Sequence, residues 1–225
     1  MTPILTIRPQ PGARHSVAAG RARGLEITAF PLSVVQQLDW IGPDLAEVDA
    51  LLVGSANAFR HGGTQLARYR DKPAYVVGPA TAREAASLGF RVQLAGEGGL
   101  QALLDKVQQR PVRLLRLAGQ RHVEITAPEG VALTTIEIYA VHDLPIPDAM
   151  AEILRSGATV LLHSAGAAEH FRNQCLAQGL DLARIRLAAL GPRIADAAGA
   201  GWGRVGWCDA PESGALLDLA ADMCQ

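Results

Sequence analysis

Polar side chains stand directly after several apolar runs of this sequence, and their types suit the binding of an anion. Arginine pairs with carboxylates and phosphates through a planar fork of N–H donors. Helix N-termini add unpaired backbone N–H groups and a partial positive charge. We therefore expect these corners to bind a ligand with several carboxylates or phosphates, although serine and threonine are also common helix caps. The candidates are Arg8, Ser55, Asn57, Thr81, Ser164 and Arg193.

Small residues accompany these polar candidates. The corners read Ser-Ala-Asn at 55–57 and Ser-Ala-Gly at 164–166, and Gly-Pro pairs stand at 78–79 and 191–192. Small side chains let a ligand approach the backbone closely, so N–H groups can bind it without many Lys or Arg. The small residues included among the candidates are Ala56, Ala165, Gly166 and Pro192.

Motifs of the common cofactor and metal enzymes do not occur. The sequence contains no GxxxxGK[ST], HExxH or GxSxG, and its six histidines show no ligand spacing. The glycine-rich stretch GAGWGRVG (199–206) follows a helix-like segment and precedes an apolar one, which is the wrong order for a dinucleotide fingerprint. We therefore expect neither a cofactor nor a metal site.

The elements that carry these corners alternate regularly. Short apolar runs of strand length alternate with alanine-rich segments of helical length. Runs that are apolar on successive residues suit strands buried on both faces of a parallel sheet, so the rhythm predicts an α/β fold. The runs are 3–7, 50–54, 74–78, 112–117, 159–163 and 186–190.

An internal repeat predicts two similar domains. Three landmarks recur in the same order: a strand followed by Ser-Ala, a strand followed by Gly-Pro, and a Gly followed by a leucine-rich helix. The first set lies at 49–59, 77–90 and 98–107, and the second lies at 158–171, 190–203 and 213–223. A single such match is common among α/β folds, whereas three in order favour duplication of a parallel-sheet domain.

Two proline-containing stretches interrupt the rhythm and suggest how the domains are joined. Residues 25–38 and 132–147 are rich in β-branched residues and alternate in polarity. If they pair, they form a two-stranded β linker, one domain is inserted in the other, and a cleft lies between them. We expect a discontinuous domain of residues 1–33 and 144–225, an inserted domain of residues 36–140, and linkers at about 30–37 and 136–145.

Composition limits the class of partner. The 225 residues include 21 Lys+Arg and 22 Asp+Glu, so no general attraction to nucleic acid or to an anionic membrane is expected. No apolar run approaches a membrane span, and the first ten residues lack the features of a signal peptide. Cys175, Cys208 and Cys224 are odd in number and widely spaced, which favours reduced thiols in the cytoplasm.

The ordered set of motifs resembles the uroporphyrinogen-III synthase family. It comprises ILTIRP, LLVGSANAF, YVVGPATAREAASLGF, IEIYAV, VLLHSAGAAEHF and ALGPRIADAA, and it covers nearly the whole chain. The resemblance implies two α/β domains joined by a two-stranded ladder. It also implies cofactor-free cyclisation of hydroxymethylbilane, with loss of water and inversion of the last pyrrole ring, for haem, sirohaem or corrin synthesis. The substrate is a polycarboxylate, and the enzyme that makes it, hydroxymethylbilane synthase, is a candidate for transient contact.

The resemblance also assigns roles to single residues. Tyr139 of IEIYAV matches a tyrosine near the family's cleft that could help the hydroxyl leave, although a tyrosine in a strand also suits plain packing. Thr81 matches a corner threonine that would cap a helix facing substrate, and it is the second catalytic candidate. Arg8, Ser55 and Ser164 match an arginine and two serines of the family motifs.

The sequence departs from the family pattern at four positions, the first of which is Ile7, in place of the threonine of the opening Thr-Arg-Pro motif. Gly54 stands where threonine is common, and Arg193 and Ile194 replace the two threonines of the second corner. Arg193 adds a charge that suits a carboxylate, whereas the loss of the hydroxyls is compatible with a less active enzyme. The alternative function is therefore a non-catalytic two-domain protein that binds a tetrapyrrole or a small anion.

Overall fold

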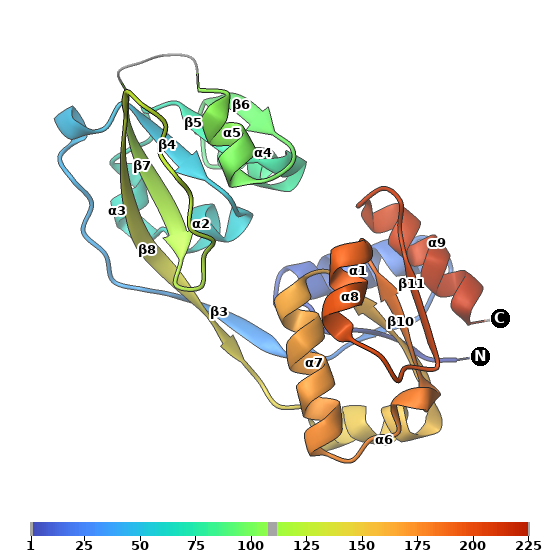
Figure 1. The fold of residues 1–225 in the computed structure, drawn as a ribbon. Helices are drawn as coiled ribbons and strands as arrows, with labels where there is room; N and C mark the ends of the chain where they lie inside the picture. Colours follow the sequence, from blue (N-terminus) through green and yellow to red (C-terminus); the bar gives the residue numbers. More distant parts are fainter. Residues whose placement is uncertain (1, 108–111, 225) are drawn as a thin grey trace. The chain divides into compact units, whose positions relative to one another are not determined.

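The structure, a computed structural model, describes residues 2–107 and 112–224 (Figure 1). The chain divides into two compact units. Unit 1 consists of Met1–Val34 and His142–Gln225, and unit 2 consists of Val35–Val141. Each unit contains one β-sheet with helices packed on it.

Unit 1 contains a five-stranded parallel sheet in the order β11-β10-β9-β1-β2. Val160 at the centre of the sheet pairs with Leu5 on one side and with Leu187 on the other. All three side chains are fully or almost fully buried, because helices cover both faces of the sheet. The strands are β1 (Ile4–Thr6), β2 (Ile27–Ala29), β9 (Ala158–Leu162), β10 (Ile185–Ala189) and β11 (Arg204–Trp207).

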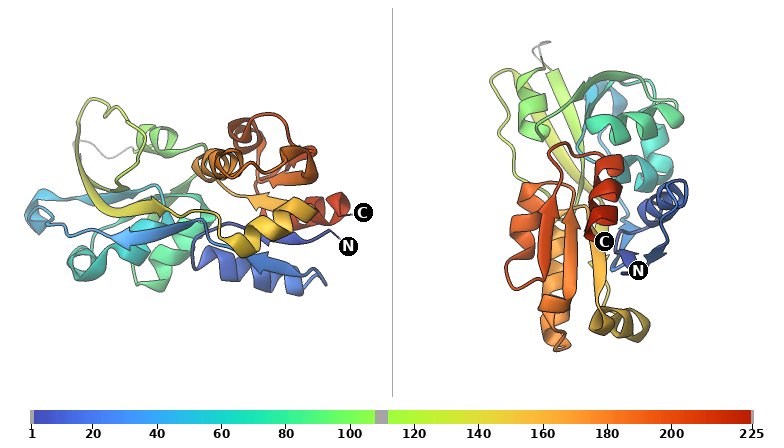
Figure 2. Two further views of the ribbon diagram at one scale, coloured as in Figure 1. Left: turned by 90° about the horizontal axis from the view of Figure 1, so that it is seen from below. Right: turned by 90° about the vertical axis from the view of Figure 1, so that its right-hand side faces the viewer.

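The helices of unit 1 form a layer on each side of this sheet (Figure 2). Met150, Phe171 and Ala195 bring α6, α7 and α8 onto one face. Leu216 and Met223 bring α9 onto the other face, where α1 also packs. The helices are α1 (Gly12–Arg21), α6 (Asp148–Ser156), α7 (Ala165–Ala177), η2 (Leu182–Arg184), α8 (Pro192–Ala198) and α9 (Ser213–Met223).

Unit 2 contains a six-stranded sheet in the order β3-β8-β7-β4-β5-β6. The strands from β8 to β6 are parallel to their neighbours. Backbone bonds join Leu38 N to Ile138 O and Leu144 N to Leu32 O, which is antiparallel pairing beside β3 and β8. The strands are β3 (Ser33–Gln37), β4 (Ala50–Val53), β5 (Ala74–Val77), β6 (Val92–Gly96), β7 (Val112–Gly119) and β8 (Val131–Asp143).

The sheet of unit 2 is also covered on both faces. Phe59, Leu66 and Ala85 bring α2, α3 and α4 onto one face. Leu103 and Leu104 bring α5 onto the other, where the connection between β7 and β8 also runs (Figure 1). The helices are η1 (Leu45–Glu47), α2 (Ala56–His61), α3 (Gly63–Ala67), α4 (Gly78–Ser87) and α5 (Leu100–Asp105).

The fold class predicted from the sequence is confirmed: two α/β units have parallel-dominated sheets. Each of the six apolar runs overlaps a strand, whereas the short edge strands β2, β6 and β11 were not among them. The expected linkers stay a prediction. The three cysteines are free thiols. Within the described part of the chain, no helix is long and apolar enough to cross a membrane.

Candidate active site

Three adjacent strands of unit 1 end at one edge of its sheet and carry the candidate residues there. Arg8 follows β1, Ser164 follows β9, and Pro192 and Arg193 follow β10. The carboxyl edge of an open parallel sheet is where helix N-termini gather and where ligands commonly bind. The structure therefore brings the unit 1 candidates to one edge, as the sequence analysis expects.

The N-terminus of α7 is an open part of this edge. Ser164 is the N-cap, and its hydroxyl accepts a hydrogen bond from Ala167 N at 3.4 Å. Ala165 is half-buried and Gly166 is exposed. A Cβ at Gly166 would meet no atom within 4 Å. The first N–H groups of this 13-residue helix thus face open space.

Arg8 and His163 place a cation beside a neutral imidazole at the same edge. Arg8 Nη1 donates a hydrogen bond to Ser16 Oγ at 3.3 Å. Burial lowers the pKa of His163 to about 3, and the positive charge of Arg8 contributes to the shift. His163 Nδ1 is buried, and no described residue forms a hydrogen bond with it. The imidazole is therefore neutral at physiological pH.

The second Gly-Pro corner differs from the family pattern in a way that the structure explains in part. Pro192 and Arg193 are exposed at the start of α8, and none of the described residues forms an ion pair with Arg193. Ile194 is half-buried and packs against the core of unit 1. The isoleucine thus stabilises the corner by apolar contact, while Arg193 beside it is exposed.

Candidates of unit 2 lie at the end of β4. Ser55 is the N-cap of α2, and its hydroxyl accepts from Asn57 N at 3.2 Å. Ala56 is buried and Asn57 is half-buried. The capping role considered for both Ser55 and Ser164 is therefore present. Among the described residues, no hydrogen bond involves the Asn57 side chain, whereas the Ser55 hydroxyl serves as the cap.

Thr81 does not cap its helix, so this expectation is wrong. The N-cap of α4 is Val77, and Thr81 lies inside the first turn with 4% of its surface exposed. The helix begins earlier than expected because Gly78 adopts a φ of 77°, a backbone conformation that favours glycine. The threonine consequently faces the interior of unit 2.

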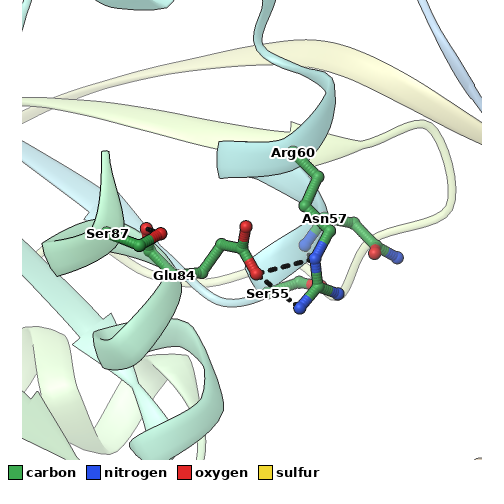
Figure 3. A network of polar contacts seen from close by, with 5 residues as sticks. All are labelled: Ser55, Asn57, Arg60, Glu84 and Ser87. Atoms are coloured by element: carbon green, nitrogen blue, oxygen red, sulfur yellow. Dashed lines mark hydrogen bonds and ion pairs between the residues drawn. The ribbon is translucent and has the colours of Figure 1, made fainter. Parts of the chain in front are cut away.

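An ion pair fixes the two helices that carry Asn57 and Thr81. Arg60 of α2 contacts Glu84 of α4, with Nε 2.8 Å and Nη2 2.5 Å from Oε2 (Figure 3). Both side chains are about three-quarters buried. The pair therefore sets the position of α2 against α4 at the carboxyl edge of unit 2.

Tyr139 lies in the core of unit 2, beside the carboxyl end of β7. It pairs in register with Gly119 and is 9% exposed. Its ring centroid is 6.4 Å from that of His61, the last residue of α2. Burial, followed by the charge of Arg60, lowers the pKa of His61. The packing role considered for Tyr139 is thus observed, and a chemical role stays a prediction.

Three polar residues near these edges were not among the candidates from the sequence, namely His61, His163 and Arg116. Arg116 left a signal, because it is a charged residue inside the apolar run 112–117. The two histidines left none, since their burial arises from the fold. Within the described residues, no group of three or more His, Cys, Asp or Glu could hold a metal ion.

The chain is a two-unit α/β protein that carries candidate residues at the carboxyl edges of two parallel-dominated sheets. The sequence model described as uroporphyrinogen-III synthase HemD matches residues 15–218. The chain therefore belongs to the uroporphyrinogen-III synthase family, and its activity is that of a cyclising hydro-lyase in tetrapyrrole biosynthesis.

Solved structures of the same family share the fold. The uroporphyrinogen-III synthetase of Helicobacter pylori 26695 is 17% identical with a TM-score of 0.67, and the match covers 99% of this chain and 100% of that chain. A mutant uroporphyrinogen III synthase of the extreme thermophile Thermus thermophilus is 16% identical with a TM-score of 0.55, over 100% and 99% of the two chains. A search of curated proteins returned no match. The comparisons give no support to the alternative of a non-catalytic binding protein.

Proposed function

We propose that the chain binds the carboxylates of hydroxymethylbilane at the carboxyl edges of its two sheets. The observation that carries this proposal is the open N-terminus of α7, where Gly166 is exposed and Arg8 and Arg193 follow the two neighbouring strands. The other contributing residues that we propose are Ser55, Ala56, Asn57, Thr81, Ser164, Ala165 and Pro192.

The reaction requires mainly that the substrate is held in a productive geometry. The C–O bond of the terminal hydroxymethyl group breaks, the hydroxyl leaves with a proton as water, and a reactive azafulvene remains. The last pyrrole ring attacks it through its substituted carbon, which gives a spiro intermediate and then the inverted ring. Held in a productive geometry, such a reactive group needs little further activation. A site made of N–H donors and arginines is consistent with this requirement.

Tyr139 is our candidate for the proton donor to the departing hydroxyl. A positioned proton donor contributes about 10²–10⁴-fold to a rate. His61, whose pKa is lowered by burial, lies beside the phenol ring and would hold it in place. Thr81, buried in α4, would act through the position of its helix. The reaction as proposed uses no cofactor or metal.

We also propose that the chain works in the cytoplasm and receives its substrate by transient contact with hydroxymethylbilane synthase. Three free cysteines suit a reducing compartment. Burial raises the pKa of the Cys175 thiol to about 12, so this thiol remains protonated. A direct transfer would shorten the time in which the bilane closes by itself without inversion.

Gly166→Asp tests the proposed site, with Gly166→Ala as its matched control. The aspartate meets no steric obstacle, and a carboxylate in the first turn stabilises a helix by about 0.3–1 kcal/mol. It also repels the substrate's carboxylates from the N–H groups of α7. We expect Gly166→Asp to be at least as stable as Gly166→Ala but to yield mainly the uninverted isomer from hydroxymethylbilane. A folded Gly166→Asp variant with normal inversion would place the substrate elsewhere.

A further inference from the structure

Arg116 is a buried cation in the sheet of unit 2. It lies on β7, is 4% exposed, and pairs in register with Leu52 of β4. Residues two apart on a strand share a face, so Arg116 projects on the same side as Leu114, which packs with α5. A charged side chain in such apolar surroundings requires a compensating partner.

The partners within the chain are insufficient for this guanidinium. Nη2 donates a hydrogen bond to Val123 O at 2.7 Å. Nε is buried, and none of the described residues accepts a hydrogen bond from it. Glu124 is the acidic group that acts on Arg116, but its side chain is 94% exposed and so offers little compensation. Burial accordingly lowers the pKa of Arg116.

The guanidinium lies near the carboxyl edge of the sheet, under the connection that follows β7. The connection is anchored independently of Arg116. Gln101 of α5 bonds both the N–H and the carbonyl of Thr126, at 2.8 and 3.1 Å. His122 Nδ1 lies 2.9 Å from Gly119 O. These contacts hold the connection without Arg116. The attachment of the connection therefore does not explain why an arginine occurs at this position.

We propose that Arg116 binds a carboxylate of the tetrapyrrole at the carboxyl edge of unit 2. The proposal rests on the proposed function and adds a side-chain anion site to a unit whose other candidates are Ser55, Ala56, Asn57 and Thr81. A carboxylate accepts two parallel hydrogen bonds from a guanidinium, which would satisfy the donor that the chain leaves unpaired. The approach would lie beside Val123, which is 78% exposed and whose carbonyl accepts the hydrogen bond from Arg116.

Two substitutions of Arg116 test the site. Arg116→Gln removes the charge, and Arg116→Lys keeps it but removes the fork. Because a hydrogen bond to a charged group contributes about 1.5–3 kcal/mol, we expect Arg116→Gln to raise the Kd for uroporphyrinogen III about 10-fold or more. KM for hydroxymethylbilane should rise similarly, with a smaller change in kcat. Arg116→Lys should lose less affinity, and it decides the question if Arg116→Gln does not fold.

Two control variants separate the anion site from a structural effect. Gln101→Ala releases the same connection but leaves Arg116 in place, and we expect its Kd to stay within about 2-fold of wild type, well below one tenfold step. Arg113→Gln removes an exposed arginine of the same strand, one paired with Asp49 at 2.6 Å, and should also preserve Kd. Folded Arg116 variants with wild-type Kd, or an equal loss in Gln101→Ala, would overturn the proposal.

The proposed function fails in a different measurement. If the folded Gly166→Asp variant forms the inverted isomer from hydroxymethylbilane normally, the proposed function is wrong. Binding of uroporphyrinogen III by wild type and the Arg116 variants is measured separately, without turnover. A wild type that turns over normally, with variants unchanged in Kd and KM, refutes the Arg116 site alone.

Discussion

The ring of Tyr139 occupies the space in which any residue other than glycine at position 119 would place its side chain. A Cβ at Gly119 would lie 2.6 Å from Cε2 and 2.7 Å from Cζ of the tyrosine. Real Cβ atoms do not approach a ring so closely, so the glycine is required by the position of the ring. Sequence position 119 thus controls where the phenol of Tyr139 lies.

Gly119→Ala should displace the ring of Tyr139 and lower the activity. Overpacking of a core commonly costs about 1–3 kcal/mol, and we expect a loss of unfolding free energy in this range. Tyr139→Phe keeps the ring and should be much less destabilising, while the rate of isomer III formation falls if the phenol donates a proton. Denaturant unfolding and product isomer analysis measure the two effects. A folded Gly119→Ala variant with the wild-type rate would show that the position of Tyr139 does not affect the reaction.

The two Gly-Pro corners should respond differently to alanine. Gly78 has a φ of 77°, whereas Gly191 has a φ of −175°, which any residue adopts. A Cβ would meet no atom within 4 Å at either position, so only the backbone differs. We expect Gly78→Ala to destabilise the protein by about 1–2 kcal/mol and Gly191→Ala to have little effect on stability. Equal melting temperatures for the two variants would contradict this expectation.

The same comparison shows what the sequence could predict. Apolar runs such as 50–54 and 159–163 identify the buried strands β4 and β9 because most residues in them are apolar. Ser55 and Ser164 are recognisable as caps because capping depends on residues within one turn. The two glycines look equivalent in sequence, yet one begins a helix and the other caps one.

Other properties of the site depend on contacts between distant segments. Thr81 is buried because α4 begins at Gly78, which shifts the position of the threonine within the first turn. Arg116 is buried because α5 and the connection after β7 cover the same face of the sheet. Such burial depends on segments that are far apart in the sequence. The charged residue in a predicted strand can therefore be noticed in the sequence, but its burial cannot be predicted.

The free energy of unfolding should decrease as pH falls through a range that the folded and unfolded pKa values of His163 define. Its pKa is about 3 in the folded chain and 6.5 in the unfolded one, so only the unfolded state binds the proton between these values. The free energy of unfolding is therefore unaffected by this group above about pH 6.5 and decreases as pH falls toward 3. We expect His163→Gln to remove a slope of up to about 1.4 kcal/mol per pH unit from denaturant midpoints measured at several pH values.

Two other groups must be separated from His163 in that measurement. The hydrogen bond from Arg113 holds the pKa of Asp49 at about 2 against an ordinary 3.8, so its contribution is present above about pH 4 and is lost only below it. His61, whose pKa is also lowered, contributes a slope of the same sign and remains in the His163→Gln variant. A pH slope above about pH 4 that is unchanged by His163→Gln would show that this imidazole is not buried as described.

The ion pair between Arg60 and Glu84 should affect substrate binding more than stability. Pairs with partly exposed side chains contribute about 0.2–1 kcal/mol, and about a quarter of each side chain is exposed here. We therefore expect Arg60→Ala, Glu84→Ala and the double variant to give a coupling energy of unfolding below about 1 kcal/mol. Because the pair fixes α2 against α4, its loss should displace Asn57 and raise KM for hydroxymethylbilane in both single variants. The double variant should raise KM no further than either single one. If KM rises additively, the two residues act independently and the pair does not position the corner.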